Sequence, residues 1–447
     1  MIAQENEQLP DKKTVILDGT RHGEKHLDSI LALLINVLRD KGAAVQRFKL
    51  QDIKINHCIG CFSCWLKTPG RCIHADAGAD ILQAIQSSNT LIFFTPIVFG
   101  GYSSELKKIV DRFLPMALPF FSEVHGETRH PLRYPKSIRL LGIGVQPCFQ
   151  KKTSKCFKML VGRNAANFHS RYAAEVFSSM DSPEVLQSQF QALLSRRDES
   201  PGRDELTSLM NDALPAPDIS PGNRKALLIV GSPKIKLPST SAILGNYLLE
   251  QLRKHGWETE SLPLGKNLLG RKGQDDLCTA VTRSDTIIIA FPLYCDTLPF
   301  LLTKAFEVIA LHKEGGEPKK ILAVVNNGFP ESYQNNVALA ICRNFAVECG
   351  MTWAGGLAMG AGEGLLSGHP VTAFKGLKGL KRPPLYYVNR ALKITAAALA
   401  EGHSVPKKAV QLIAKKPIPL ISFDLWRRLY MKRGKMIWEK EALKNGV

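Results

Sequence analysis

The chain has 447 residues with an apolar fraction typical of a globular protein, and 59 Lys and Arg against 40 Asp and Glu give a formal net charge of +19. This length is too great for one ordinary core and predicts two domains of about 200 residues each. No apolar run reaches the roughly 18 residues that span a bilayer, which excludes a membrane-spanning protein. The cations crowd the segment after Lys375, so the charge belongs to the C-terminal part and predicts no specific nucleic-acid partner.

The first residues, 1–13, are charged and lack the apolar stretch of a signal peptide. We therefore expect a cytoplasmic protein, in which cysteines stay reduced. Residues 14–17 are an apolar run that predicts a short buried strand. A polar loop over residues 18–23 follows it, and a helix-period pattern then continues to about Leu38.

Four cysteines come next within a single short run: Cys58, Cys61, Cys64 and Cys72. Structural zinc sites usually draw two C-x-x-C pairs from separate hairpins. A C-x-x-C-x-x-C run with a fourth cysteine close behind is more typical of iron–sulfur ligation. The spacing therefore favours a [4Fe-4S] cluster, with a zinc site and a loop of packed free thiols as the two alternatives.

The order of strand, loop and helix then repeats in the second half of the chain. The expected elements are strands over residues 91–96, 226–230 and 286–292, and helices over 106–113, 240–254 and 302–311. Short apolar strands that alternate with helices are typical of parallel sheets covered on both faces. The sequence thus predicts an α/β protein built as a tandem duplication of a doubly wound domain.

The boundary between the copies is expected in the polar, proline-containing stretch around residues 195–218. We expect four parts: a first domain over 1–200, a linker over 201–223, a second domain over 224–370 and a basic C-terminal helical extension over 371–447. The extension is expected to contain two helices, over residues 385–401 and 423–443.

Ligands of doubly wound sheets bind beyond the carboxyl ends of the strands, and a helix N-terminus there favours phosphate. The loop after the first strand of the first domain offers Thr20, Arg21 and His22. The equivalent loop of the second domain offers Ser232, Lys234, Ser239, Thr240 and Ser241. Neither loop has the G-x-G-x-x-G fingerprint of dinucleotide sites, so a mononucleotide phosphate is expected, with an ordinary turn as the alternative.

The third strand leads into a run that resembles the flavin-ring loop of the flavodoxin-like NAD(P)H-dependent FMN reductases: Thr95, Pro96, Ile97, Val98, Phe99 and Gly100, followed by Lys107 and Asp111-Arg112. The cysteine run resembles the motif of the iron–sulfur flavoprotein branch of that family. The resemblance is most specific over residues 13–115. The second half is similar more loosely, through Pro292, Leu293 and Tyr294, and has no cysteine run.

This resemblance implies two flavodoxin-like domains with five-stranded parallel sheets, and FMN as a cofactor with NAD(P)H as electron donor. In the family the ring is held by backbone amides and an aromatic side chain. This chain has Val98 where the family often has Tyr, which leaves Phe99 or Tyr102 for that role. Flavin and cluster meet across a subunit contact in the family, so the tandem chain is expected to form a pseudo-dimer by itself, with a homodimer of chains as an alternative.

The expected function is that of an FMN-dependent oxidoreductase. Electrons from NAD(P)H would pass through FMN bound to the first domain and a [4Fe-4S] cluster to a quinone, a flavin or another small acceptor. The alternative is a non-catalytic electron carrier or redox sensor that exchanges electrons with a ferredoxin-like protein. No sequence motif identifies a catalytic acid, base or nucleophile.

The last expected helix mixes aromatic and cationic side chains, including Trp426, Tyr430 and Trp438 beside Arg427 and Lys432. Such a helix could lie on an anionic membrane surface. The favoured alternative is that its apolar side docks on the second domain while its cations stay solvated.

Overall fold

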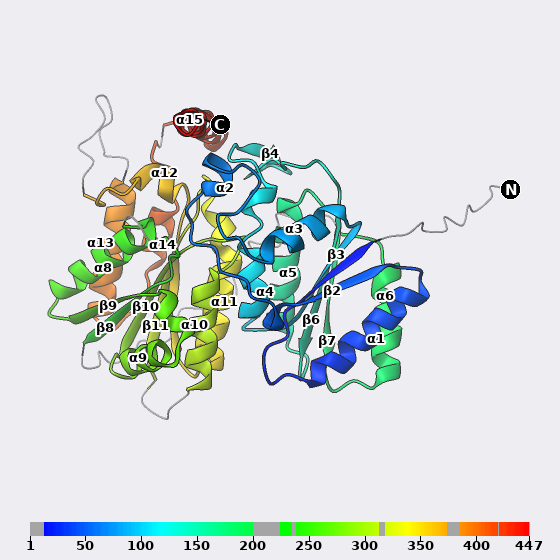
Figure 1. Ribbon diagram of the computed structural model, residues 1–447. Helices are drawn as coiled ribbons and strands as arrows, with labels where there is room; N and C mark the ends of the chain where they lie inside the picture. The colour runs from blue at the N-terminus through cyan, green and yellow to red at the C-terminus, as the bar shows by residue number, and fades with distance from the viewer. Residues whose placement is uncertain are drawn as a thin grey trace.

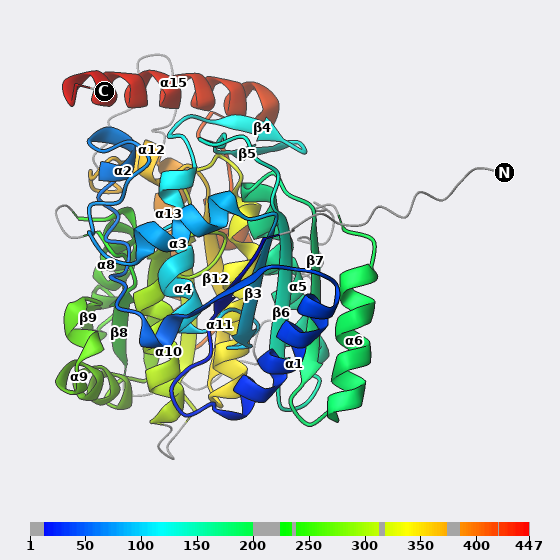
Figure 2. The same cartoon turned by 45° about the vertical axis from the view of Figure 1, so that its right-hand side comes forward.

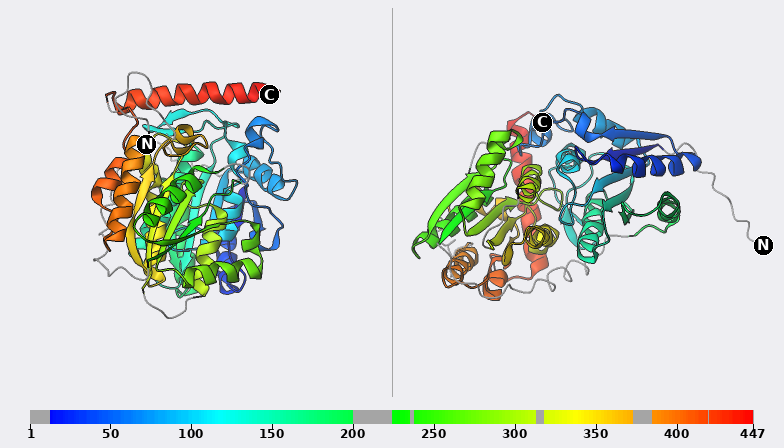
Figure 3. Two further views of the ribbon diagram at one scale, coloured as in Figure 1. Left: turned by 90° about the vertical axis from the view of Figure 1, so that its left-hand side faces the viewer. Right: turned by 90° about the horizontal axis from the view of Figure 1, so that it is seen from below.

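The computed structural model of the protein describes residues 13–199, 224–234, 238–312, 318–372, 385–418 and 420–446. Two five-stranded parallel sheets lie side by side with helices between them (Figures 1 and 3). We call residues 13–199 the first half and residues 224–446 the second half. The expected linker over 201–223 lies outside the described residues, and the four domain boundaries remain predictions.

The first sheet has the strand order β2-β1-β3-β6-β7. Its strands are β1 (Thr14–Asp18), β2 (Val45–Lys49), β3 (Thr90–Pro96), β6 (Arg139–Gln146) and β7 (Tyr172–Ser178). One face is covered by α1 (His26–Asp40) and α6 (Pro183–Ser195), whose apolar sides pack on Ile16, Ile92 and Leu141. The other face is covered by α3 (Gly78–Ser87), α4 (Ser104–Val110) and α5 (Lys151–Asn167).

The second sheet repeats this arrangement with the order β12-β11-β10-β8-β9. Its strands are β8 (Lys225–Val230), β9 (Glu258–Pro263), β10 (Thr286–Pro292), β11 (Lys320–Asn326) and β12 (Thr352–Met359). The face toward the first half carries α9 (Arg271–Thr282), α10 (Phe300–Leu311) and α11 (Asn336–Glu348). The outer face carries α8 (Thr240–Arg253), α13 (Tyr386–Ala400) and α14 (Lys407–Ile413).

The predicted fold class is therefore confirmed: two flavodoxin-like α/β units with five parallel strands each. One hydrophobic core runs from β1 and β3 through the facing helices of both halves to β8 and β11. The two halves share this core and do not pack as separate globules. No helix in the described part of the chain is long and apolar enough to cross a membrane.

Three further segments lie at one end of the pair of sheets. They are the short helix α2 (Ser63–Leu66), the hairpin of β4 (Ser122–Val124) and β5 (Glu127–Arg129), and the last helix α15 (Phe423–Lys444). In Figure 2, α15 lies across the top of the molecule, over α2, the hairpin and α12 (Gly362–Leu366). The expected C-terminal helices are present as α13 and α15, and α13 with α14 packs into the core of the second half.

Candidate functional site between the two halves

Helices α4 and α10, which occupy equivalent places in the two halves, cap each other. Asp111, just after α4, accepts a hydrogen bond of 2.7 Å from the backbone N–H of Phe300 at the start of α10. In return, Glu307 in α10 accepts bonds of 2.8 and 2.6 Å from the N–H and hydroxyl of Ser104 at the start of α4. Each carboxylate satisfies an N–H that a helix leaves unpaired at its N-terminus. This reciprocity is what an isologous two-fold contact looks like within one chain.

The cysteine-bearing loop, residues 58–72, is pinned by Arg112. The Arg112 guanidinium is buried and donates to the Asn56 carbonyl at 3.1 Å and to both Asp76 carboxylate oxygens at 2.6 and 2.7 Å. These partners lie on either side of the loop in sequence. The two residues of the Asp-Arg pair noted in the sequence therefore have different roles. Asp111 caps helix α10 of the other half, and Arg112 holds both ends of the cysteine-bearing loop. We call this loop the Cys loop.

The Cys loop lies against the second half. A Cβ placed on Gly60 would be 2.7 Å from the Tyr294 hydroxyl and 3.9 Å from the Cα of Lys234. Tyr294 and Lys234 follow β10 and β8, so the loop touches the carboxyl edge of the second sheet. The cavity wall at this contact includes Cys61 but no residue of 20–22 or 95–100 of the first half. The expectation that the cysteines serve a flavin bound to the first domain stays a prediction.

The four thiols differ in environment. Cys61 is exposed and Cys64 is buried, while Cys58 and Cys72 are intermediate. Burial raises the pKa of both Cys58 and Cys64 to about 12, and the neighbouring thiols of the loop add to the rise. Four soft sulfur donors on one loop suit a cluster chemically. Nevertheless, among the described residues no three His, Cys, Asp or Glu side chains are grouped so that they could hold a metal ion.

A cavity of about 910 Å³ opens where the Cys loop, the hairpin and α15 meet the carboxyl edge of the second sheet. That size is in the usual range for cofactor and ligand sites, about 300–1,000 Å³. The second half contributes the residues after four of its strands: Lys234, Leu293 to Asp296, Asn327 to Phe329, and Glu363 to Leu365. This is the edge at which doubly wound sheets bind ligands.

Aromatic side chains form the wall opposite that edge. Trp438 of α15 packs edge-on against Trp65 and Phe62 of the Cys loop, with ring centroids 5.2 and 5.5 Å apart. His130, after the hairpin, lies 4.8 Å from Trp65 and 5.1 Å from Phe329. Burial among these rings lowers the pKa of His130 to about 4, so the imidazole is neutral at pH 7. The wall therefore offers flat apolar surfaces and no permanent charge from His130.

Helix α15 closes the cavity through one face. Trp426, Leu429, Tyr430, Arg433, Ile437 and Trp438 line it at helical spacing. The Tyr430 hydroxyl donates to the Gly328 carbonyl at 2.8 Å, and Arg427 donates to the Gly126 carbonyl at 2.6 Å. The helix is thus tied to the second half and to the hairpin at once, where the sequence predicted docking on the second half alone.

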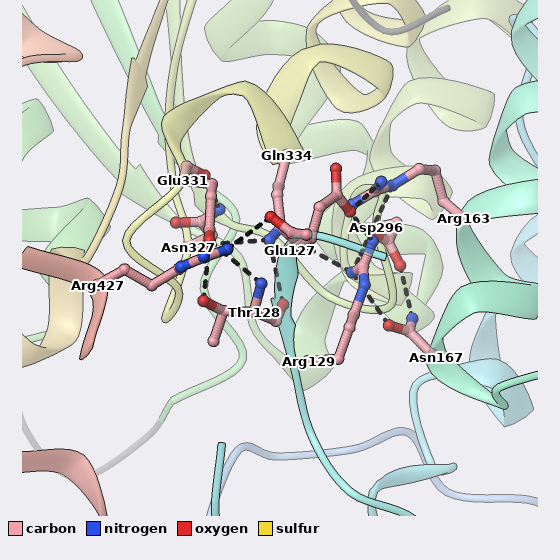
Figure 4. A network of polar contacts seen from close by, with 11 residues as sticks. Glu127, Thr128, Arg129, Arg163, Asn167, Asp296, Asn327, Glu331, Gln334 and Arg427 are labelled. Atoms are coloured by element: carbon pink, nitrogen blue, oxygen red, sulfur yellow. Dashed lines mark hydrogen bonds and ion pairs between the residues drawn. The ribbon is translucent and has the colours of Figure 1, made fainter. Parts of the chain in front are cut away.

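A buried polar network forms the floor of the cavity and joins the halves (Figure 4). Arg129 of the hairpin and Arg163 of α5 both donate to the Asp296 carboxylate, at 3.1 and 3.3 Å. Both arginines also pair with Glu127. Burial opposes ionisation of Asp296, but Arg129 and Arg163 outweigh it and hold its pKa below the usual value. Two cations and two anions thus compensate one another away from water.

The hairpin also binds the loop after β11. Glu331 accepts bonds of 3.1 and 2.8 Å from the backbone N–H and the hydroxyl of Thr128, and Gln334 donates to the Thr128 carbonyl at 3.2 Å. The pairing in this region is not complete. The buried atoms without a hydrogen-bond partner among the described residues include Asn327 Oδ1, Arg129 Nε, Glu127 Oε1, Arg163 Nη2 and Arg427 Nε. Of these residues, Arg129 and Asn327 line the cavity.

Of the second-half candidates, Lys234, Leu293 and Tyr294 line the cavity. The other four lie near the strand ends without lining it: Ser232, Ser239, Ser241 and Pro292. Ser239 caps α8 by accepting from the Ala242 N–H, and Ser241 accepts a bond of 2.7 Å from the Asn326 amide. Ser232 is half-buried next to Lys234, and Pro292 ends β10. Lys234 pairs with Glu363 at 2.8 Å, and Thr240 donates to the same carboxylate at 3.1 Å.

The first-half candidates lie apart from this cavity. Thr20 and Arg21 bond to carboxylates of their own loop, and His22 is exposed. Thr95 and Pro96 are buried at the end of β3, and Ile97 is half-buried. Val98, Phe99 and Gly100 pack on the second half: the Asn344 amide donates to the Phe99 carbonyl at 2.9 Å, and the Phe99 ring packs on Phe345. Val98 and Phe99 line a cavity of only about 10 Å³.

The loop over residues 326–331, which contains Asn327, was expected from the sequence to line either a flavin edge or a nicotinamide pocket, with a plain turn as the alternative. The cavity residues that were not predicted include Arg129, Asn167, Asp296 and the inner face of α15. Asp296 could have been found by aligning the two halves at their strand ends. Arg129 lies in an insertion that has no counterpart in the second half. The inner face of α15 had a signal in its aromatic spacing, but nothing in the sequence says what lies beneath it.

Comparison with known proteins agrees with the geometry of the first half. Residues 13–128 match the family described as NADPH-dependent FMN reductase. An iron–sulfur flavoprotein of Methanocaldococcus jannaschii is 29% identical over 108 residues, which are 24% of this chain and 55% of that protein. One from Archaeoglobus fulgidus is 25% identical over 103 residues, or 23% and 46% of the two chains. The chain thus spans about half the length of these curated relatives.

Solved structures give more distant matches. An FMN-dependent NADH-azoreductase from Bacillus anthracis in complex with FMN is 14% identical, with a TM-score of 0.28, and the match covers 39% of this chain and 99% of the other. An NAD(P)H:quinone oxidoreductase from Methanothermobacter marburgensis is 13% identical, with a TM-score of 0.26 and coverage of 39% and 95%.

Proposed function

We propose that the protein is an FMN-dependent oxidoreductase that uses NAD(P)H and reduces a small acceptor such as a quinone or a flavin, because residues 13–128 match the NADPH-dependent FMN reductase family. One observation carries the proposal: the Cys loop of the first half and the strand ends of the second half enclose a single cavity of about 910 Å³. FMN, when bound, exchanges a hydride with NAD(P)H and passes electrons on.

The residues of the cavity suit a flavin. Lys234, Asn167 and Asn327 bring polar side chains to the cavity wall. Trp65, Trp438 and the neutral His130 provide flat apolar surfaces for a ring. Helix α15 covers one side of the cavity with Trp426, Tyr430 and Trp438.

We further propose that Cys58, Cys61, Cys64 and Cys72 hold a [4Fe-4S] cluster. The names of the archaeal relatives and the donor set support this, and the cluster would supply one-electron transfer beside the cavity. Arg112 would hold the two ends of the Cys loop in place, and of the four proposed ligands Cys61 is the one that lines the cavity.

The test is anaerobic purification with FMN, iron and sulfide measured per chain, followed by NADH and NADPH oxidation with quinone and flavin acceptors. We expect bound FMN, about four irons and steady oxidation of one nicotinamide. A Cys61→Ser variant should keep FMN and lose iron. A chain that binds no flavin contradicts the proposal, and one that is reduced only by ferredoxin is an electron carrier instead.

A further inference from the structure

We infer that FMN binds at the carboxyl edge of the second sheet, facing the Cys loop of the first half, and that the chain holds one FMN and not two. This inference rests on the proposed function and assigns its cofactor to the half outside the family match. The argument compares the two edges position by position, because the halves have the same strand order and equivalent loops.

The phosphate loops can be aligned through one backbone bond. The Gly19 N–H donates to the Phe94 carbonyl and the Gly231 N–H to the Ala290 carbonyl, each at 2.8 Å, so Thr20 and Ser232 are equivalent. The residue before the glycine is Asp18 in the first half and Val230 in the second. The fully buried Asp18 accepts bonds of 3.0 and 2.6 Å from the Thr20 N–H and hydroxyl. A phosphate would need those same donors.

Two more carboxylates close the first-half loop. The Arg21 N–H donates to Glu24 at 2.9 Å, and the Arg21 guanidinium pairs with Glu24 and lies 3.7 Å from Glu307. A phosphate dianion at this loop would face Asp18, Glu24 and Glu307 in a partly buried place, where like charges repel strongly. The protein's own carboxylates therefore occupy the anion position of the first half.

The described residues of the second-half loop, 231–234 and 238–240, keep the features that a phosphate uses. The 14-residue helix α8 begins at Thr240 behind the Ser239 cap, and its N-terminal N–H groups and dipole favour an anion. Lys234 lies in the cavity wall beside it. Within the part of the chain that the structure describes, the carboxylate that pairs with Lys234 and Thr240 is Glu363, whose side chain is 51% exposed on α12. A phosphate at this loop competes with this solvated partner.

The loops that would face the flavin ring differ between the two halves as the phosphate loops do. The Ile97 N–H donates to the Val145 carbonyl at 2.9 Å and the Leu293 N–H to the Asn326 carbonyl at 2.7 Å, so Gln146 and Asn327 are equivalent. The Gln146 amide is satisfied at both ends, by Ser154 at 3.2 Å and Thr153 at 3.3 Å. Asn327 lines the large cavity, and Gln146 does not. The loop at the second edge therefore faces a space that a ring can enter, and its counterpart is packed within the first half.

The experiment compares two matched cations on the intact chain. Lys234 and Arg21 lie on equivalent loops of the two halves, and each pairs with a glutamate. Lys234→Ala and Arg21→Ala therefore each remove one cation from one of these loops. Apoprotein is titrated calorimetrically with FMN and with riboflavin, which lacks the phosphate. We expect one FMN per wild-type chain, a Kd for FMN about tenfold higher in Lys234→Ala, and a Kd within about twofold of wild type in Arg21→Ala. Riboflavin binding should be nearly the same in all three.

A second readout guards against misfolded variants. Trp65 and Trp438 line the large cavity, so FMN should quench tryptophan fluorescence, and a Trp65→Phe/Trp438→Phe variant should lose most of the quenching. Two FMN per chain, or weaker binding in Arg21→Ala alone, overturns the inference while the proposed function stands. A wild-type chain that binds no FMN overturns the proposed function, and the inference falls with it.

Discussion

Gly60 of the Cys loop lies directly on Tyr294 of the second half, so close that a Cβ on Gly60 would be 2.7 Å from the tyrosine hydroxyl. Gly60 also has a φ of +63°, a conformation that side chains other than glycine rarely adopt. Both the backbone and the contact thus require glycine here. The cysteine motif is seated on the other half of the chain by this position.

Gly60→Ala should lower the free energy of unfolding by more than Gly42→Ala. Gly42 also has a positive φ, +77°, but a Cβ there would meet nothing within 4 Å. Gly42→Ala therefore carries only the backbone cost, about 1 kcal/mol, and Gly60→Ala carries that cost plus the contact. Urea unfolding measures both. Adding Tyr294→Phe to Gly60→Ala should recover part of the lost stability. Equal effects of Gly60→Ala and Gly42→Ala would show that Tyr294 moves away from the added Cβ at little cost.

Asp296→Asn should be strongly destabilising. The substitution leaves Arg129 and Arg163 buried with one carboxylate between them, a change that typically costs about 3–5 kcal/mol. Glu250→Gln serves as the control, because Glu250 pairs with Lys254 on the surface and should change stability by less than about 0.5 kcal/mol. Thermal unfolding of the two variants tests this, and similar melting temperatures would contradict a compensated network.

Acid should destabilise the protein partly through His130. Its pKa is about 4 in the folded protein and near 6.5 when unfolded, so the unfolded chain binds the proton first. The contribution of neutral His130 to the free energy of unfolding is therefore complete above about pH 6.5 and is lost as the pH falls toward 4. His57, buried against Phe300 with a pKa of about 4, adds to the same slope.

His130→Phe should flatten the fall in stability between pH 6.5 and 4. The control is His125→Gln, which changes an exposed histidine of the same hairpin and should leave the slope unchanged. Urea midpoints at several pH values give the comparison. An unaltered slope in His130→Phe would mean that His130 has the same pKa in the folded and the unfolded protein.

Glu363→Gln should tighten FMN binding several-fold. The substitution frees Lys234 from its 2.8 Å ion pair and removes a carboxylate that competes with a phosphate there. Glu258→Gln, at the opposite end of the same sheet, is the matched control and should not alter the Kd. Weaker FMN binding in Glu363→Gln would show that Glu363 holds Lys234 in the position that the cofactor needs.

Gly434→Ala should loosen α15 although alanine is the better helix former by about 1 kcal/mol. A Cβ at this position would clash with the Phe121 ring beneath the helix. In a Phe121→Ala background the same substitution should become neutral or stabilising. Limited proteolysis near the C-terminus measures how firmly α15 is docked. Greater resistance to the protease in Gly434→Ala would contradict the close packing of Gly434 on Phe121.

Much of the architecture could be predicted from local patterns. The apolar runs at residues 91–96 and 286–292 correspond to β3 and β10, because a parallel strand buried on both faces has to be apolar throughout. The positions of the cavity residues could not be predicted in this way. Arg129 and Asp296 are 167 positions apart in the chain and meet only when the halves pack, and neither has a local signature.

By itself, the sequence determined the two parallel sheets, the cysteine spacing and the loops at the strand ends, since each depends on residues close together in the chain. Only the tertiary structure decided which edge became a cavity. The Cys loop, the hairpin with Arg129 and the face of α15 around Trp438 come from three distant segments and cover the second edge. At the edge of the first sheet, the carboxylates of Asp18 and Glu24 accept the hydrogen bonds that an anion would need. Enclosure and the balance of buried charge are properties of packing, and local pattern does not encode them.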